Sequence, residues 1–291
     1  MTVSAQRSRQ AALLSTGLAL LWGLLEQLPS IGLRGYSSYQ VVWMRYGVHL
    51  AFLAIVLGPK YGSRLVKTGR PMLQIGRATL MLTMPVCAVL ASERLGGDST
   101  WALFWLAPLM IVMLGSLLHA EPTRHAGWAA TLICLAGALV MSRGPLPHSR
   151  AGIVFALGMG LSYALYTALT RSLRDEPTAV NLVHTAFWVF IPLSVVMPRV
   201  WRPVTGTAAV TAVAVGLLGL AGLWLLDRMA AESPVGSTAP FLYLQPVSTI
   251  AFRDLLRGRP PDRWSLVAAV VVVGVLARYA GSLPAVQSEL T

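Results

Sequence analysis

The sequence separates into long apolar runs and short polar connections, and this separation restricts the fold more than any other feature. Ten runs reach the roughly 20 residues that a helix needs to cross the hydrocarbon core of a bilayer. Of the 23 basic and 11 acidic residues in the chain, only six lie inside these runs. The runs are residues 11–33, 38–58, 72–92, 100–119, 125–142, 151–170, 178–198, 206–226, 236–256 and 264–281.

These runs predict an all-α integral membrane protein with ten transmembrane helices. Charged residues make up 12% of the chain, whereas a soluble protein carries about 25%. Strands of an open sheet would leave backbone groups unpaired in lipid, so each run is expected to be a helix. Most connections are short, and consecutive helices should therefore be antiparallel neighbours. We expect a multi-pass protein of a bacterial cytoplasmic membrane.

The net charge of +12 does not indicate a nucleic-acid partner. The basic residues lie mostly between apolar runs, where anionic membrane lipid attracts them and the cytoplasmic side retains them. In the first half of the chain this charge favours a cytoplasmic N-terminus, whereas in the second half it favours the reverse. Early helices usually decide orientation, so both termini are predicted to be cytoplasmic.

The two halves of the chain share a repeated pattern. Around the fourth run the sequence has Pro108, Leu117-Leu118, Ala120 and Pro122, and a shift of 138 residues gives Pro246, Leu255-Leu256, Gly258 and Pro260. Five helices per copy is an odd number, so the second copy must enter the membrane upside down. The prediction is two inverted five-helix repeats, residues 1–146 and 147–291, an arrangement found in secondary transporters.

Motifs in both halves carry a family resemblance. The first half has Leu21-Trp22-Gly23, Arg45, Leu106–Leu109, Glu121, Trp128 and Arg143-Gly144-Pro145; the second has Ser162–Tyr166, Thr170-Arg171, Ala239–Gln245 and Pro261-Asp262. In order and spacing, these resemble the drug/metabolite transporter superfamily with duplicated EamA-type domains, most of all the branch that includes S-adenosylmethionine-type carriers. The sequence departs from that pattern at Arg259, where an acidic residue is expected, and at Arg253-Asp254, where the family is usually apolar.

The resemblance implies export or uptake of a small metabolite through a central cavity. Helices one, three, four, six, eight and nine would line this cavity, and helices five and ten would lie outside it. By the same resemblance, Trp22, Tyr163 and Tyr166 fall on cavity helices and are candidate substrate contacts; packing is the alternative for all three. Tyr243 belongs to the polar side of helix nine and is a further candidate.

Glu26 and Arg45 are the deepest ionisable residues, and an ionisable residue inside a membrane is a functional candidate because its insertion is costly. At 1.5 Å rise per residue, both lie roughly 4–6 Å from the midplane on the outer side. Equal depth on antiparallel neighbours predicts an ion pair, with either a structural role or a role in substrate or proton handling. His184 follows Pro177 as Arg45 follows Ser38, seven residues later, so it is a candidate at the repeat-equivalent position. A packing role is the alternative, and the more frequent one for a lone histidine.

Other unusual residues have simpler interpretations. Arg77, Arg253 and Arg278 lie near the ends of their runs and are expected to extend to lipid headgroups. Trp101 fits an interfacial belt. Cys87 and Cys134 lie singly in apolar runs and fit small buried side chains. Residues 267–277 have no polar stripe and are expected to face lipid or a partner subunit, so a homodimer is one alternative.

Three classes of function compete. A secondary carrier for a small polar or amphipathic metabolite, amino-acid-like because both charge signs occur in the membrane, is preferred. An intramembrane enzyme acting on lipid-linked substrates would need a cluster of acids or histidines, whereas here the acids are scattered. A membrane scaffold would leave Glu26 and Arg45 unexplained. No HExxH, GxSxG, Walker or complete GxGxxG motif occurs, so we expect no catalytic residue, metal or cofactor.

The predicted topology can be tested with reporters fused to the C-terminus. Ten spans and a basic first half place this terminus in the cytoplasm. A fluorescent-protein fusion should therefore be bright, and an alkaline phosphatase fusion should be inactive. An active phosphatase fusion would show that a span was miscounted or that the charges of the second half control orientation.

Overall fold

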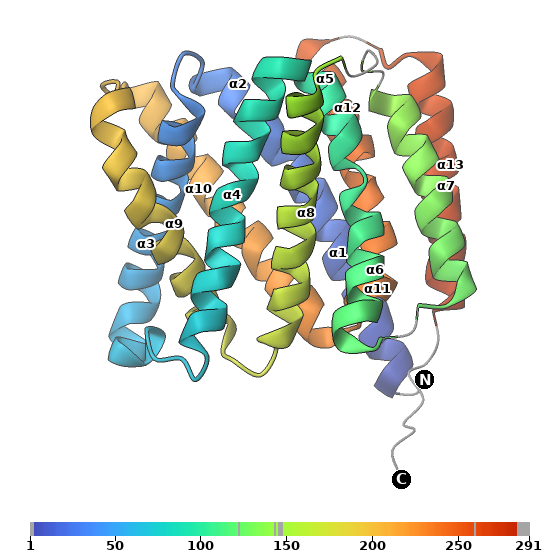
Figure 1. The fold of residues 1–291 in the computed structure, drawn as a ribbon, viewed down its shortest axis with the longest axis horizontal. Helices are drawn as coiled ribbons and strands as arrows, with labels where there is room; N and C mark the ends of the chain where they lie inside the picture. Colours follow the sequence, from blue (N-terminus) through green and yellow to red (C-terminus); the bar gives the residue numbers. More distant parts are fainter. Residues whose placement is uncertain (1–2, 122, 143, 145–147, 259, 284–291) are drawn as a thin grey trace.

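The structure of the chain is a computed structural model that describes residues 3–121, 123–142, 144, 148–258 and 260–283. Within these ranges every regular element is helical. Figure 1 shows long helices standing side by side in one bundle, with α1 (Val3–Gln27) beginning and α13 (Arg263–Ser282) ending at the same edge. We call this edge the N-terminal face and the opposite edge the far face. Termini on one side agree with an even number of crossings.

Between these two helices the chain crosses the bundle repeatedly, mostly in single long helices. Three of the crossings consist of two pieces: α1 continues into α2, α3 into η1, and α5 into α6. The intervening elements are α2 (Pro29–Gly32), α3 (Ser38–Tyr61), η1 (Gly62–Leu65), α4 (Pro71–Leu95), α5 (Gly97–Phe104), α6 (Ala107–His119), α7 (His125–Ser142), α8 (Arg150–Ser172), α9 (Thr178–Val200), α10 (Gly206–Glu232), α11 (Val235–Thr238), η2 (Ala239–Tyr243) and α12 (Leu244–Arg257).

Nine segments of the described chain are long and apolar enough to cross a membrane. They correspond to the predicted runs except the ninth, residues 236–256, which is divided into α11, η2 and α12. Pro240 begins η2 and Pro246 lies at the start of α12, and a proline has no N–H to donate to the preceding turn. The predicted ninth helix is therefore divided at its prolines, and its three pieces together make the ninth crossing (Figure 1).

Helix packing follows the inverted repeat. The pair α4–α8 joins the third and sixth crossings, and its counterpart α1–α10 joins the first and eighth. Likewise the pair α3–α10, of the second and eighth crossings, is matched by α9–α4, of the seventh and third. The pair α1–α12, of the first and ninth crossings, is matched by α8 with α5 and α6, of the sixth and fourth. The pairs α3–α9 and α7–α13 map onto themselves. The fold is therefore all-α with two inverted five-helix repeats, as predicted. The proposed boundary between residues 146 and 147 lies outside the described residues.

The two repeats also end their fourth crossing in the same way. Ala120 follows α6 and Gly258 follows α12, 138 residues apart, and both adopt the left-handed conformation, with φ of 49° and 61°. Glycine commonly ends helices in this conformation because it has no Cβ. Ala120 is the one non-glycine residue of the described chain with a positive φ. The first repeat therefore carries strain that the second avoids.

Replacing Ala120 with glycine should raise stability. The left-handed conformation costs an L-residue about 1 kcal/mol or more, and glycine removes most of that cost. We expect Ala120→Gly to raise the midpoint of thermal unfolding in detergent. The matched control is Ala277→Gly on the exposed face of α13, where the same change should lower stability by about 1 kcal/mol. A lower midpoint for Ala120→Gly would contradict the strain argument.

Candidate substrate cavity

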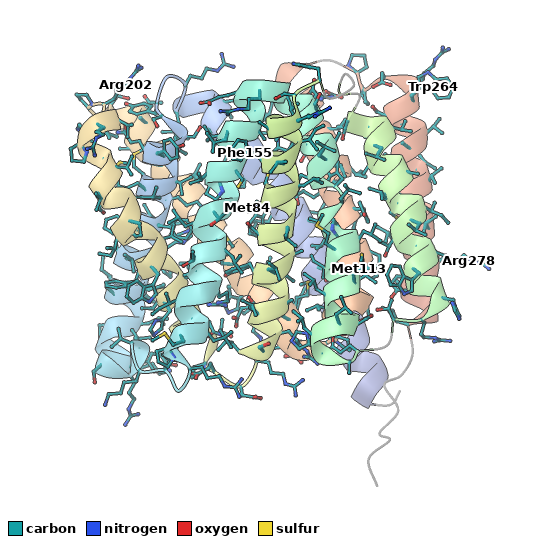
Figure 2. All side chains as sticks on the ribbon, viewed as in Figure 1. Met84, Met113, Phe155, Arg202, Trp264 and Arg278 are labelled. Atoms are coloured by element: carbon teal, nitrogen blue, oxygen red, sulfur yellow. The ribbon has the colours of Figure 1, made fainter. Side chains whose placement is uncertain are left out.

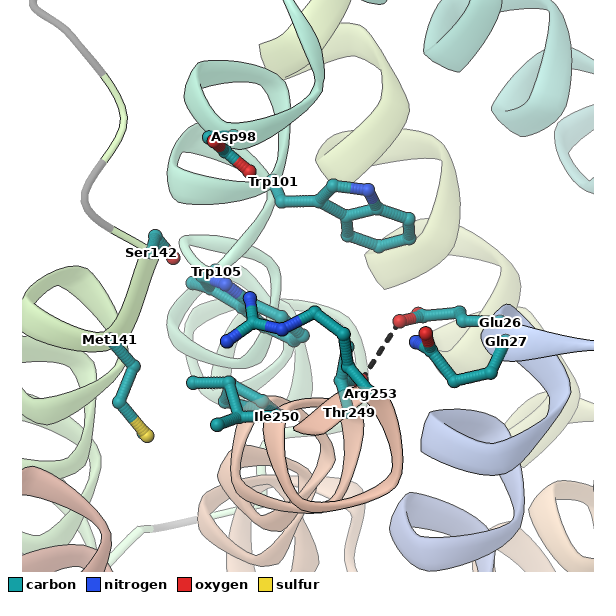
Figure 3. Close-up of a pocket in the computed structure, with 11 residues that line it drawn as sticks. Glu26, Gln27, Asp98, Trp101, Trp105, Met141, Ser142, Thr249, Ile250 and Arg253 are labelled. Carbon is teal, nitrogen blue, oxygen red and sulfur yellow. Dashed lines mark hydrogen bonds between the residues drawn. The ribbon is translucent and has the colours of Figure 1, made fainter. Parts of the chain in front are cut away.

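A cavity of ≈ 220 Å³ lies towards the far face between helices of both repeats. Figure 3 shows Glu26 entering from α1, Trp101 from α5, Met141 from α7 and Arg253 from α12. The cavity thus has walls from three crossings of the first repeat and one of the second. Its lining comprises Glu26, Gln27, Asp98, Trp101, Trp105, Met141, Ser142, Pro246, Thr249, Ile250 and Arg253.

Glu26 is held against α12. Its carboxylate accepts hydrogen bonds from Gln245 Nε2 at 2.5 Å and from Thr249 Oγ1 at 2.8 Å. Close packing of α1 on α12 makes this geometry possible, because Ser248 donates to the carbonyl of Ala19 and lies directly over Gly23. A Cβ at Gly23 would collide with Ser248. The carboxylate therefore lies at the cavity wall with two neutral donors, and no cation among the described residues is bonded to it.

Two further charges share the cavity with Glu26. Asp98 lies near the start of α5, and Arg253 reaches in from α12. Arg253 Nε also donates to Asp254 Oδ1 at 2.9 Å, and its side chain is partly exposed. The prediction that Arg253 simply extends to lipid headgroups was wrong, because the amphipathic α12 turns this residue towards the cavity. An acid, a second acid and a guanidinium therefore line one small space.

Two indoles form the rest of the polar-aromatic wall. The rings of Trp101 and Trp105 lie 5.9 Å apart, and Phe104 packs against both. Tyr243 is fully buried and donates its hydroxyl hydrogen to the carbonyl of Trp105 at 3.0 Å. Trp101 thus lines the cavity. Its interpretation as an interfacial belt residue stays a prediction. Tyr243 lies behind the wall and fixes the backbone that carries Trp105.

Trp22, Arg45 and Tyr163 form a cluster one turn of α1 below Glu26. The Arg45 guanidinium lies 5.6 Å from the Trp22 ring and 5.7 Å from the Tyr46 ring, and Tyr163 meets Trp22 edge-on at 6.5 Å. These contacts are cation–π and aromatic contacts, each contributing on the order of 1 kcal/mol. Three residues predicted separately are thus brought together, adjacent to the cavity and not in its lining.

The predicted ion pair between Glu26 and Arg45 is not formed. Glu26 bonds to α12, whereas Arg45 Nε and Nη2 are buried without a hydrogen-bond partner in the described chain. Gly219 of α10 makes room for Arg45, because a Cβ there would overlap Nε. The argument from equal depth was wrong because it ignored the directions in which the two side chains leave their helices.

A second charged site lies near the N-terminal face, between α4, α9 and α10. Arg77 is 1% exposed, and its Nη1 lies 3.7 Å from Asp227 Oδ1. Its Nη2 donates to Gln74 Oε1 at 3.1 Å and to the carbonyl of Asn181 at 2.6 Å. Asn181 in turn donates to Asp227 at 2.9 Å and accepts from Gln74 at 2.6 Å. The four side chains close a network across the two repeats.

The same network includes hydroxyl groups of α8 and α9. Arg77 donates to Thr170 at 3.2 Å and to Thr185 at 2.8 Å, and its guanidinium lies 5.2 Å from the Tyr166 ring. The prediction that Arg77 extends to headgroups was therefore wrong. Tyr166, predicted as a cavity residue, belongs to this network. Sequence reasoning missed Asp227 because its run was ended at residue 226, whereas α10 continues to Glu232.

The remaining predicted residues lie away from the cavity. His184 Nε2 is 3.1 Å from the carbonyl of Val66, in the connection between η1 and α4. A coupling role for His184 stays a prediction that no cavity contact supports. Arg278 extends outward from α13, as expected, and Figure 2 shows it at the edge of the bundle.

The bundle is closed beneath the cavity, at the N-terminal face. Arg171 Nε donates to Glu121 Oε1 at 2.8 Å, and its Nη1 donates to the carbonyls of Ala230 and Ala231 at 2.8 and 3.0 Å. Glu121 Oε2 accepts from the backbone N–H of Val235 at 3.2 Å. These bonds join the ends of α6, α8 and α10 to the start of α11. The cavity therefore lies at one end of the bundle and this closure at the other.

Comparisons with known proteins match this architecture. Residues 150–277 match the model of the EamA-like transporter family. Protein RarD of Salmonella typhi is 22% identical over 193 residues, which cover 63% of this chain and 62% of RarD. The S-adenosylmethionine uptake transporter of Rickettsia conorii is 20% identical over 240 residues, 81% of this chain and 80% of that protein. The match therefore spans less than two thirds of RarD.

A solved structure shows the same fold. One crystal structure superposes with a TM-score of 0.82 at 20% sequence identity, covering 96% of this chain and 99% of the other. At this identity the likeness concerns the fold alone. The similarity extends over all ten crossings, beyond the second repeat that the family model matches.

The closure at the N-terminal face can be tested by cysteine labelling. Arg171→Ala removes three hydrogen bonds and leaves Glu121 without its cation, so the four helix ends should separate more often. In a chain with Cys87→Ala and Cys134→Ala, a Ser233→Cys probe beside this closure is buried. We expect Arg171→Ala to speed maleimide labelling of the probe roughly tenfold, a change that about 1.4 kcal/mol produces. The control Arg174→Ala, on an exposed arginine, should leave the rate unchanged.

Proposed function

We propose that the chain is an EamA-type member of the drug/metabolite transporter superfamily and a secondary transporter for a small zwitterionic metabolite. It is a multi-pass protein of the bacterial cytoplasmic membrane and a membrane transporter. The proposal adds the class of substrate and the residues that bind it. The observation that carries it is the cavity shared by both repeats, in which carboxylates, a guanidinium and two indoles meet.

The cavity can recognise opposite charges on one small molecule. Glu26 and Asp98 suit an ammonium group, and Arg253 suits a carboxylate because a guanidinium presents paired donors. The faces of Trp101 and Trp105 suit an apolar or cationic part of the substrate. A cavity of ≈ 220 Å³ fits a metabolite of amino-acid size better than a lipid. Small polar or amphipathic zwitterions satisfy all three requirements.

The arrangement of the two ends supports alternating access. Arg171 and Glu121 close the N-terminal face while the cavity lies near the far face. Inverted repeats allow the two halves to rock about a site near the midplane, so that the far face closes and the N-terminal face opens. With the N-terminus in the cytoplasm, as the charges of the first half favour, this conformation would receive substrate from outside. Movement would be driven by a gradient of protons or of substrate.

The other candidate residues are proposed to act at different distances from the substrate. Glu26 makes direct contact. Trp22 and Tyr163, with Arg45 stacked on Trp22, form the support below it, and Tyr243 positions Trp105. Because Arg45 is buried with donors that no described residue satisfies, it is the group able to bind a carboxylate if the cavity deepens during transport. Tyr166 would act through the Arg77 network, which links the repeats.

Two competing functions receive less support. An enzyme acting on lipid-linked substrates would gather its acids and histidines, whereas Glu26, Asp227 and His184 occupy three separate places in the described structure. A scaffold gives no reason for charged residues in a cavity between the two repeats, where their burial is costly. A homodimer through the exposed apolar face of α13 remains compatible with a carrier, since Val267 and Val270 of that face are exposed.

Substitution of Glu26 tests the proposed substrate class. In proteoliposomes, the wild-type protein should take up zwitterionic amino-acid derivatives in preference to their deaminated analogues. Glu26→Gln keeps the size and removes the charge; its amide oxygen can still accept from Gln245, and its NH2 group can donate to Thr249 Oγ1. It should lower uptake of the zwitterion at least about tenfold, since a bond to a charged group contributes roughly 1.5–3 kcal/mol.

The matched control is Glu93→Gln on α4, whose side chain is 63% exposed. It should transport normally, and both variants should elute as the wild type does in size-exclusion chromatography. Unchanged uptake by Glu26→Gln, or preference of the wild type for deaminated anions, would contradict the proposed site.

A further inference from the structure

A groove of ≈ 640 Å³ lies at the N-terminal face, at the opposite end of the bundle from the cavity. Its walls come from α1, α3, η1, α9 and α10. We propose that this groove binds the headgroup of an anionic phospholipid. The inference does not depend on the transported molecule, because none of the groove residues lines the cavity.

Two arginines supply the positive charge. Arg64 is exposed, and its side chain makes no hydrogen bond or ion pair with the described residues. Arg228 donates from Nη2 to Glu232 at 2.6 Å, and its other donors have no hydrogen-bond partner among the described residues. Glu176, the nearby acid before Pro177, accepts from Thr68 and from the backbone of Gly69. The lining of the groove thus contains two arginines and no acid, and a phosphate group would satisfy the donors that these arginines do not use within the described chain.

Aromatic and apolar side chains occupy the rest of the groove. Tyr61 is 40% exposed and Trp224 is 45% exposed, and Leu14 and Val180 form part of the wall. Tyrosine and tryptophan favour the headgroup level of a bilayer, where one end of the side chain is apolar and the other is wet. The groove thus joins a charged zone to an apolar zone at the depth where a lipid headgroup lies.

The outer surface of α10 continues from the groove as a track for an acyl chain. Trp224, Leu217, Val213 and Val210 follow one another at intervals of seven, four and three residues, so they share one face of the helix. All four are exposed, from 41% for Leu217 to 72% for Val210. A soluble phosphate would use only the two arginines, whereas a phospholipid uses the arginines and this track. The geometry therefore favours lipid.

Lipid selectivity and one exposed arginine test the proposal. The full-length protein, purified in a neutral detergent, is titrated with phosphatidylglycerol and with phosphatidylcholine of the same chains, and bound lipid is counted by native mass spectrometry. The wild type should prefer phosphatidylglycerol. Arg64→Gln should weaken phosphatidylglycerol binding about fivefold, the effect of roughly 1 kcal/mol for one basic residue near anionic lipid. Because the Arg64 side chain is exposed and has no partner within the described chain, this variant should fold normally.

The matched control is Lys67→Gln, which removes one charge from the same face, three residues away, outside the groove. It should change binding by less than about twofold. Trp224→Ser should weaken the binding of both lipids, because it shortens the apolar track. Equal binding of the two lipids, or equal losses in Arg64→Gln and Lys67→Gln, would overturn the proposal. Displacement of the lipid by glycerol 3-phosphate at similar concentration would show a site for soluble anions instead.

Discussion

A charged side chain inside a bilayer has no water to solvate it and must find its partners within the protein, and Arg77 shows how this chain meets that requirement. Its guanidinium is shared among Gln74, Thr170, Asn181, Thr185 and Asp227, which come from α4, α8, α9 and α10. Removing one partner of such a network leaves the others desolvated and unpaired, which is far costlier than losing an exposed pair. The network therefore holds the first repeat against the second in one register.

Small residues set the distances at which the helices pack around this network. In lipid the attraction between helices comes from close packing and hydrogen bonds, so backbones approach wherever glycine permits. Gly23 admits Ser248, Gly219 admits Arg45, and Gly222 admits Trp22. Each of these contacts joins the two repeats. The same close approach positions Glu26 on α12. The chemistry of the cavity therefore depends on glycines, whose lack of a side chain lets the two helices come together.

Much of the fold could be predicted from the sequence because lipid imposes a simple rule on composition. The length of apolar runs determined the ten crossings, and the 138-residue shift identified Ala120 and Gly258, which prove to be equivalent helix ends. The ninth crossing was harder, since α12 carries Gln245, Thr249 and Arg253 on one side and is less apolar than a lipid-exposed helix. A cavity-lining helix departs from the apolar rule for the same reason that it is functional.

The cavity was less predictable because depth along the membrane normal is one coordinate of three. Residues four apart on a helix are about 40° apart around it, and this rotation separates Trp22 from Glu26. Trp22 faces α3 and α10 and receives Arg45, whereas Glu26 faces α12 and receives Thr249. The sequence placed Glu26 and Arg45 at equal height but held no information on which helices flank α1. Arg45 thus lies beside a tryptophan with donors that no described residue satisfies, one helical turn below a carboxylate with neutral partners. Two opposite charges kept apart in this way can each engage one end of a zwitterion, which a closed ion pair could not do without first breaking.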